Sequence, residues 1–173
     1  MGFYDTVLEL IDTRSFSSLW FWLALAGVWS AATRRVLGVP ADLLDRARRS
    51  ETARADVESL AQIHAARLRE LARAGGAALL ALLSAGFTAL ALLGFLYDVE
   101  LAQALFLLAM PLLAVELLAI RTARAVVRGL GGEALRRHLS RQRRLAQGIG
   151  MVAIFVTALW GTYQNLVRGA LLG

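Results

Sequence analysis

Four continuous apolar segments dominate the chain, at residues 16–33, 75–97, 101–120 and 149–166. A helix that crosses a bilayer needs about 17–25 predominantly apolar residues, and each segment meets that length. The segments lack the alternating apolar and polar positions that membrane β-strands show. The pattern therefore predicts an all-α integral membrane protein with four transmembrane helices, in a single membrane domain over residues 1–173.

The polar stretch over residues 34–74 predicts a helical segment outside the bilayer. It holds a heptad-like apolar stripe, which is too short for a coiled coil and so must pack on another polar segment of the chain or on a partner protein. Gly75 and Gly76 follow and would allow a hinge before the second span. We take the stripe as a candidate partner surface; it comprises Val57, Ala61, His64, Leu68 and Leu71.

The second polar stretch, residues 121–148, predicts a basic amphipathic helix beyond a glycine-rich break at residues 129–132. Such a helix can lie on an anionic inner leaflet, where each arginine contributes about 1 kcal/mol. Nucleic acid also attracts arginine, but the absence of interleaved aromatic residues and the tether to the membrane favour anionic phospholipid over nucleic acid. One face carries Leu135, Leu139, Gln142 and Ala146, and the candidate headgroup ligands are Arg136, Arg137, Arg141, Arg143 and Arg144.

Charge orients the predicted spans. All 19 basic residues are arginine, and nearly all lie in residues 34–74 and 121–148, whereas residues 1–15 and the tip at residues 98–100 are acidic. Arginine next to a span is retained on the cytoplasmic side, so both termini would face the periplasm. Residues 1–15 also show an amphipathic pattern that predicts a helix lying on the outer surface.

Composition restricts the chemistry. The chain is 58% hydrophobic with a mean hydropathy of +0.58, which exceeds the usual content of soluble domains. It has no cysteine and two histidines, so disulfides and thiolate metal sites are excluded. No nucleophile elbow, phosphate loop or zinc-binding histidine pair occurs. We therefore expect no cofactor, no metal and no enzymatic activity.

Glu116 is the formally charged residue inside a predicted span. An intramembrane carboxylate costs about 3 kcal/mol or more when unpaired, and it is a functional candidate for that reason. The structural interpretation is an ion pair with an arginine such as Arg34, Arg35 or Arg121. The functional interpretation is a proton or cation site, with Gln103 supplying further polarity on the same span.

Two features bear on origin. Leu37-Gly38 followed by Arg46 to Arg49, set against Leu130-Gly131 followed by Arg141 to Arg144, indicates either a 2+2 pseudo-repeat or a coincidence of composition. The stretches Leu10 to Trp22 and Met151 to Asn165 resemble a small family of alphaproteobacterial inner-membrane proteins labelled "component of the SufBCD complex". The resemblance implies a bacterial inner-membrane location. It does not imply cluster chemistry, because no cysteine is present to hold iron or sulfur.

The sequence thus favours a non-catalytic accessory, assembly or scaffolding subunit of a larger membrane complex. Its partners would be other membrane protein subunits and anionic phospholipids, and homo-oligomerisation stays open. The alternative is a small transporter or channel component that uses Glu116 for proton or ion coupling.

Overall fold

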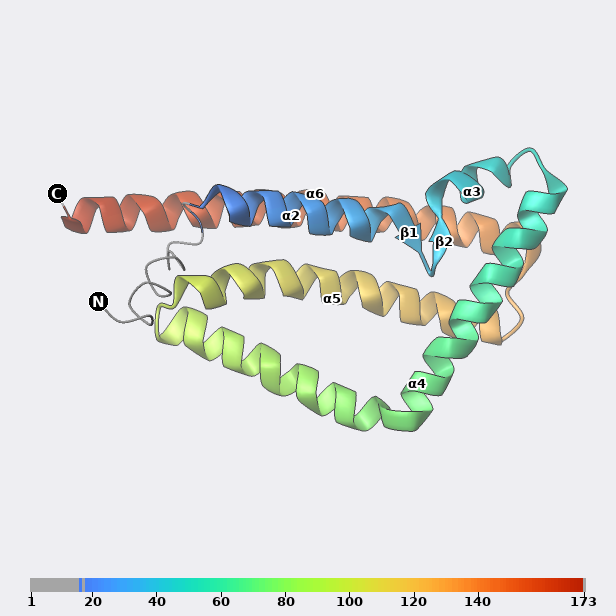
Figure 1. Cartoon of the computed structure of the whole chain (residues 1–173), viewed down its shortest axis with the longest axis horizontal. Coiled ribbons are helices and arrows are strands. Elements are labelled where there is room, and N and C mark those ends of the chain that lie inside the picture. Colours follow the sequence, from blue (N-terminus) through green and yellow to red (C-terminus); the bar gives the residue numbers. More distant parts are fainter. Residues whose placement is uncertain (1–15, 17, 173) are drawn as a thin grey trace, which may run out of the picture.

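The computed structural model describes residue 16 and residues 18–172, without the side chains of residues 35 and 168–172. The predicted outer helix within residues 1–15 lies outside the described residues. The prediction of an all-α chain is confirmed, since about 89% of the described residues are helical. The elements are α2 (Leu19–Arg34), β1 (Arg35–Val36), β2 (Val39–Pro40), α3 (Ala41–Arg46), α4 (Glu51–Ala91), η2 (Leu92–Leu96), α5 (Glu100–Val127) and α6 (Gly132–Leu172), as Figure 1 shows.

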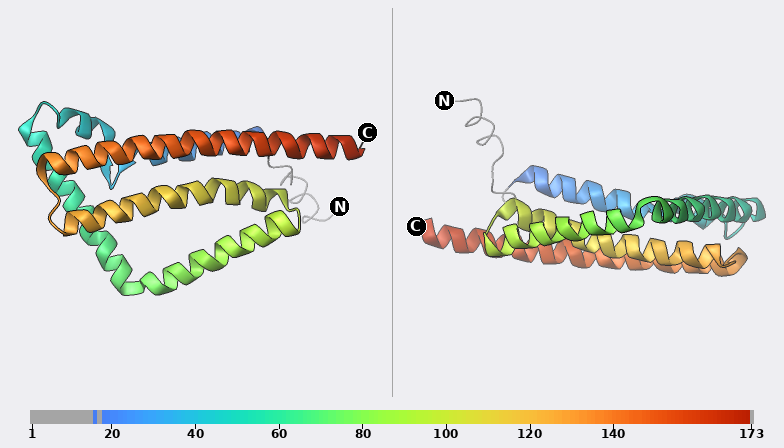
Figure 2. Two further views of the ribbon diagram at one scale, coloured as in Figure 1. Left: turned by 180° about the vertical axis from the view of Figure 1, so that it is seen from behind. Right: turned by 90° about the horizontal axis from the view of Figure 1, so that it is seen from below.

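Three helices in the described part of the chain are long and apolar enough to cross a membrane. They are α4 continued by η2, α5 and α6. The remaining predicted span corresponds to α2, which has 16 residues and is therefore about 24 Å long. It runs along α6 in Figure 1 and in the left view of Figure 2, and Trp29 of α2 lies against Gly150 of α6.

Helix α4 begins at a capped terminus and bends once. The hydroxyl of Ser50 accepts a hydrogen bond from the Ala53 amide at 3.3 Å, which satisfies one free donor of the first turn. At Gly75 the backbone leaves helical dihedral angles, so the predicted hinge is where the helix changes direction. We call residues 51–74 the polar half of α4 and residues 76–91 its apolar half. Figure 1 shows the two halves meeting at a wide angle.

The connection between α4 and α5 is a tight tip. The single π-helical turn η2 ends the apolar half, and Asp98 adopts a positive φ of 56° before α5 begins. The amide of Val99 donates to the Leu93 carbonyl at 3.0 Å, which closes the tip. Two aromatic contacts bind the helices just behind it, between Phe87 and Phe106 and between Phe95 and Phe106.

The larger hydrophobic core lies at the arginine-rich end of the molecule. The β-hairpin, α3, the polar half of α4, the end of α5 and the start of α6 all contribute to it. Val57 and Ala61, from the predicted stripe, are 3% and 0% exposed inside this core. The stripe therefore packs on its own chain there, and these two side chains are not available to a partner. Along α4 the buried residues are spaced by four, as Ala53, Val57, Ala61 and Ala65.

The second core joins α2, α5 and α6. Trp29 of α2 is 4% exposed and packs so closely on α6 that a Cβ added at Gly150 would lie 2.8 Å from its ring. At the other end of α2, Phe16 lies against Gly161. Residues that ascend in α2 thus meet residues that descend in α6, which makes the two helices antiparallel.

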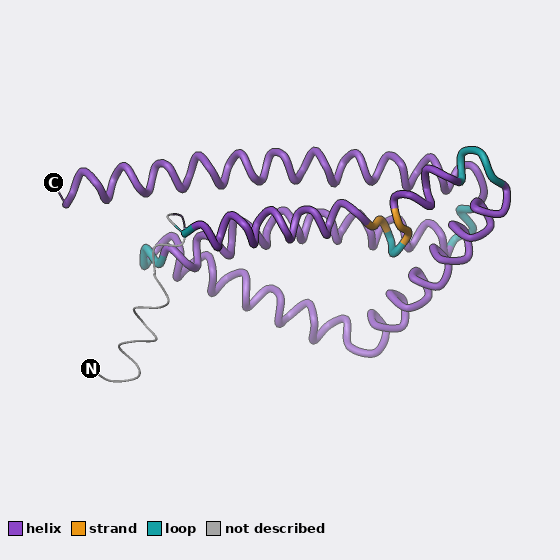
Figure 3. The backbone as a smooth tube through the Cα atoms, turned by 45° about the horizontal axis from the view of Figure 1, so that its top comes forward, coloured by secondary structure: helices purple, strands orange, loops and turns teal. Residues whose placement is uncertain are grey.

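Helix α6 differs from its predicted form. It is one helix of 41 residues that includes both the basic stretch and the last apolar segment (Figure 3). A continuous helix cannot lie flat on a leaflet and also cross it. Moreover, the face of Leu135, Leu139 and Ala146 is buried against the rest of the chain, so it is not free to insert into lipid.

The 2+2 pseudo-repeat is not confirmed. The first half of the chain reverses direction through a β-hairpin with positive φ at Leu37 and Gly38, and then bends at Gly75. The second half reverses through Gly129 and Gly132 and enters the single helix α6.

Candidate functional site

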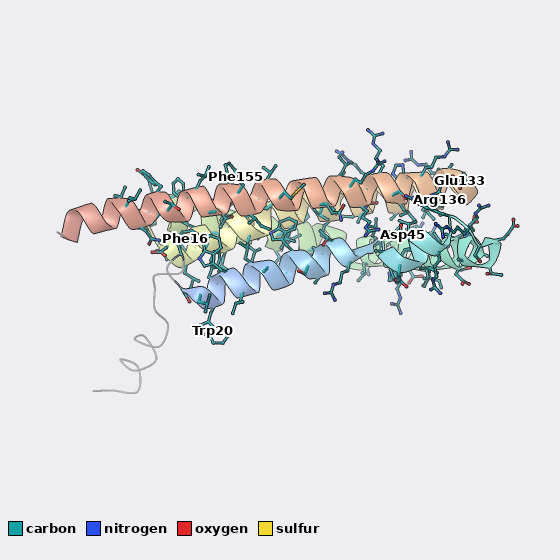
Figure 4. All side chains as sticks on the ribbon, turned by 90° about the horizontal axis from the view of Figure 1, so that it is seen from above. Phe16, Trp20, Asp45, Glu133, Arg136 and Phe155 are labelled. Carbon is teal, nitrogen blue, oxygen red and sulfur yellow. The ribbon has the colours of Figure 1, made fainter. Side chains whose placement is uncertain are left out.

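An arginine-lined hollow of about 530 Å³ lies at the arginine-rich end, where α6 passes the end of α3. Arg137, Ser140, Arg141 and Arg144 are spaced by three, one and three residues, so they lie along one face of α6. Arg48 faces them from the turn after α3, and Arg136 completes the lining. Figure 4 shows Arg136, Glu133 and Asp45 together at this end of the molecule.

Helix α3 is held in place by packing and by one ion pair. Leu44 and Ala47 are 2% and 0% exposed in the larger core. The Asp45 carboxylate accepts a hydrogen bond from the Arg143 guanidinium at 3.2 Å. This pair fixes the end of α3 against α6 and thereby brings Arg48 to the hollow. Of the predicted headgroup ligands, Arg143 is therefore committed to α3 and does not line the hollow.

Glu133 forms ion pairs with two of the arginines that line the hollow. Its carboxylate accepts two hydrogen bonds from Arg136, and Arg137 lies 3.8 Å from it. The hydrogen bond from Arg136, reinforced by the charges of Arg136 and Arg137, lowers the pKa of Glu133. The same hydrogen bond and the negative charge of Glu133 raise the pKa of Arg136. Within the side chains that the structure describes, no carboxylate forms an ion pair with Arg48, Arg141 or Arg144. The hollow thus carries an excess of positive charge.

The second candidate site is a cleft of about 280 Å³ around Glu116. The cleft is lined by the end of α2, the β-hairpin and three longer helices, and its polar residues are Glu116, His64 and Gln142. Gln142 accepts a hydrogen bond from Thr122 at 2.6 Å. Glu116 itself is exposed, and the predicted pairing is not observed, since no ion pair joins it to Arg34 or Arg121 among the described side chains.

A third polar cluster lies at the opposite end, where α5 and α6 meet the tip. Gln103 is 1% exposed and makes four hydrogen bonds. Its amide nitrogen donates to the Gly94 carbonyl at 2.7 Å and to Asp98 at 3.1 Å. Its amide oxygen accepts from Trp160 at 3.0 Å and from Gln164 at 2.6 Å. The Gln103 side chain thus uses both of its N–H donors and both lone pairs of its oxygen. It is a structural joint between α5, α6 and the tip, and it has no free donor or acceptor for a ligand.

Most of the arginines that line the hollow belong to the predicted headgroup ligands, but Arg48 does not. That residue is 93 positions from Arg141, and no local pattern relates the two; only the packing of α3 on α6 does so. The other histidine, His138, is exposed on α6, whereas His64 lies against Gly38. In the described residues no group of three His, Asp or Glu side chains is placed to hold a metal ion.

Compared with known proteins, the chain matches no family model, no curated sequence and no solved structure. A functional inference therefore depends on the geometry of the chain itself.

Proposed function

We propose that the protein is a non-catalytic accessory or scaffolding subunit of a larger bacterial inner-membrane complex. The observation that carries this proposal is the isolation of the apolar half of α4. In the most apolar 18 residues of α4 and η2 together, 6% of the residues are buried within the chain, against 17% in the most apolar part of α5 and 28% in that of α6. A partner's transmembrane helix packed on this surface would supply the close contacts that the chain itself does not.

The apolar half of α4 is attached at its two ends. At the tip it is joined to α5 through η2 and the aromatic contacts of Phe87 and Phe95 with Phe106. At Gly75 it turns into the polar half, which belongs to the larger core. Between these points it diverges from α5, as both face-on views show (Figures 1 and 2). Its exposed apolar side chains include Leu79, Leu80, Leu82 and Leu83.

The fold supports a four-span topology with the arginine-rich end in the cytoplasm. Residues of both arginine-rich stretches (34–74 and 121–148) meet in the larger core, while the tip between α4 and α5 lies at the opposite end (Figure 1). Figure 4 shows Trp20 far from Asp45, Glu133 and Arg136, toward that opposite end. We include α2 as the fourth span because it runs antiparallel beside the apolar part of α6. In this arrangement anionic phospholipid would contact Arg141 and Arg144, the hollow's arginines nearest the last apolar segment.

Photo-crosslinking in native membranes tests the scaffold proposal. A photoreactive amino acid at Leu80 or Leu82, which are 66% and 71% exposed on α4, should yield discrete adducts with another protein subunit. The matched control is Met151, which is 69% exposed on the apolar part of α6 and should react with lipid alone. An adduct with a second copy of the chain would identify the partner as a homo-oligomer. Lipid adducts alone at all three positions, together with purification as a bare monomer, would contradict the proposal.

The Glu116 cleft supports a second candidate, a proton- or ion-coupled transport component. The supporting observation is a carboxylate without an ion pair in the described residues, in a cleft that also holds His64. Under this alternative, Glu116→Gln should abolish coupled flux in proteoliposomes, whereas Glu70→Gln, an exposed carboxylate on α4, should not. Equal flux in wild type and Glu116→Gln would remove the alternative and leave the scaffold proposal unaffected.

A further inference from the structure

The arginine-lined hollow concentrates like charges in one place without matching carboxylates. Arg137, Arg141 and Arg144 lie within two turns of α6, where cations spaced by three or four residues repel each other. Folding of α3 onto α6 adds Arg48 to the same group. This arrangement raises the electrostatic energy of the isolated protein, and an anion that bridges the guanidinium groups would lower it.

We propose that the hollow binds a phosphate-bearing anion. Guanidinium groups present paired N–H donors that match two phosphate oxygens at once, which distinguishes arginine from a simple point charge. Arg48 and Arg141 approach the hollow from two separate elements, so a single phosphate group can be held from opposite sides. Ser140 adds a half-buried hydroxyl to the lining, which can donate one more hydrogen bond.

Because of its position along α6, the hollow can bind a phosphate group from either of two sources, a lipid headgroup or a soluble molecule. Arg144 lies five residues before Ile149 and Arg137 lies twelve before it, or about 7.5 Å and 18 Å along the helix. The polar layer of a bilayer is roughly 5–8 Å thick on each side. A lipid phosphate can therefore reach the edge of the hollow at Arg144, which is nearer the apolar segment. A soluble phosphorylated molecule can bind at the other edge, around Arg137. Both sources offer the same chemistry to the same side chains.

The hollow includes its own competitor. The Glu133 carboxylate accepts two hydrogen bonds from the Arg136 guanidinium and lies near Arg137. It therefore reduces the positive potential at the edge of the hollow that these two arginines form. Neutralising this carboxylate should strengthen phosphate binding. This prediction is opposite in sign to that for the arginine substitutions, and a general loss of folding cannot produce it.

The full-length protein in nanodiscs tests the site in two arms. In the first, pyrophosphate is titrated calorimetrically into protein held in pure phosphatidylcholine. In the second, protein from nanodiscs that contain phosphatidic acid is examined by native mass spectrometry for retained lipid. We expect Arg48→Ala and Arg141→Ala each to weaken binding about tenfold or more in at least one arm. Glu133→Gln should strengthen it in the same arm.

Arg67→Ala is the matched control, because Arg67 is an exposed arginine on α4 outside the hollow. It removes the same charge and should change affinity less than twofold. Dependence on Arg48 in the pyrophosphate arm identifies a soluble ligand, and dependence in the phosphatidic acid arm identifies a lipid headgroup. The proposal is overturned if neither arm shows binding that depends on the hollow, or if Arg67→Ala weakens binding as much as Arg48→Ala. The partner helix proposed for α4 plays no part in either outcome.

Discussion

Replacing Gln103 by leucine should destabilise the joint between α5, α6 and the tip. The side chain is 1% exposed and makes four hydrogen bonds. Interhelical hydrogen bonds in membrane proteins contribute about 0.6 kcal/mol each on average. Loss of four such bonds, with the Gly94 carbonyl and the Trp160 indole left without this partner, predicts a decrease of roughly 2–3 kcal/mol in unfolding free energy.

The measurement is reversible unfolding in mixed micelles, followed by helical circular dichroism as the fraction of dodecyl sulfate increases. Gln103→Leu should unfold at a lower fraction than wild type. Its tryptophan fluorescence should also change in the folded state, because Trp160 loses the acceptor of its indole N–H. Gln147→Leu is the matched control, since Gln147 is an exposed glutamine on α6. Coincident unfolding of the Gln103 variant and wild type would refute the assignment of Gln103 as a joint.

Three further predictions follow from other contacts. Gly150→Ala should lower the unfolding free energy by about 1–3 kcal/mol, because the added methyl group overpacks against the Trp29 ring. Gly148→Ala, where an added Cβ meets nothing within 4 Å, should be neutral or stabilising in the same micellar unfolding assay. The lowered pKa of Glu133 means that its ion pair contributes stability above the ordinary glutamate pKa and loses it as pH falls through the lowered value. The difference in melting temperature between wild type and Glu133→Gln should therefore be small at pH 7 and absent at pH 2. Engineered Ser59→Cys should resist a membrane-impermeant thiol reagent in intact cells and Val99→Cys should react; the reverse pattern would invert the proposed topology.

The elements that depend on local pattern could be predicted from the sequence. Continuous apolar runs placed the segments that became the apolar half of α4, α5 and the apolar part of α6. Gly75 marked the bend, and the glycines at residues 129–132 marked the break before α6. Each of these features is encoded within a few residues, either by hydropathy or by the low helix propensity of glycine.

The continuity of α6 was harder to foresee. The change from arginine-rich to apolar sequence predicts a boundary between a surface helix and a span at residues 148–149. A change in polarity does not interrupt backbone hydrogen bonding, however, and Gly148 and Gly150 are tolerated within a long helix at a modest cost. The basic and apolar parts therefore form one rod, in which the arginine-rich part continues the axis of the apolar part.

The hollow and the Gln103 joint depend on contacts between distant parts of the chain, which no local pattern contains. Arg48 reaches the hollow because Leu44 and Ala47 pack in the larger core and Asp45 pairs with Arg143. Gln103 looked like isolated polarity within a span, yet its partners come from both η2 and α6. In each case the role of one polar side chain follows from a second helix that packs beside it.

The distribution of burial supports the proposal that a partner helix binds the apolar half of α4. The larger core holds the polar half of α4, and the Gln103 joint holds the tip, so the bilayer-length helix between them is fixed at both ends. Association in a bilayer gains little from apolar area, because lipid tails are equally apolar, and depends instead on close packing and on fixed geometry. A helix fixed at both ends and diverging from α5 between them loses little further freedom on binding. For this reason a partner helix should bind here more readily than on the exposed face of α6.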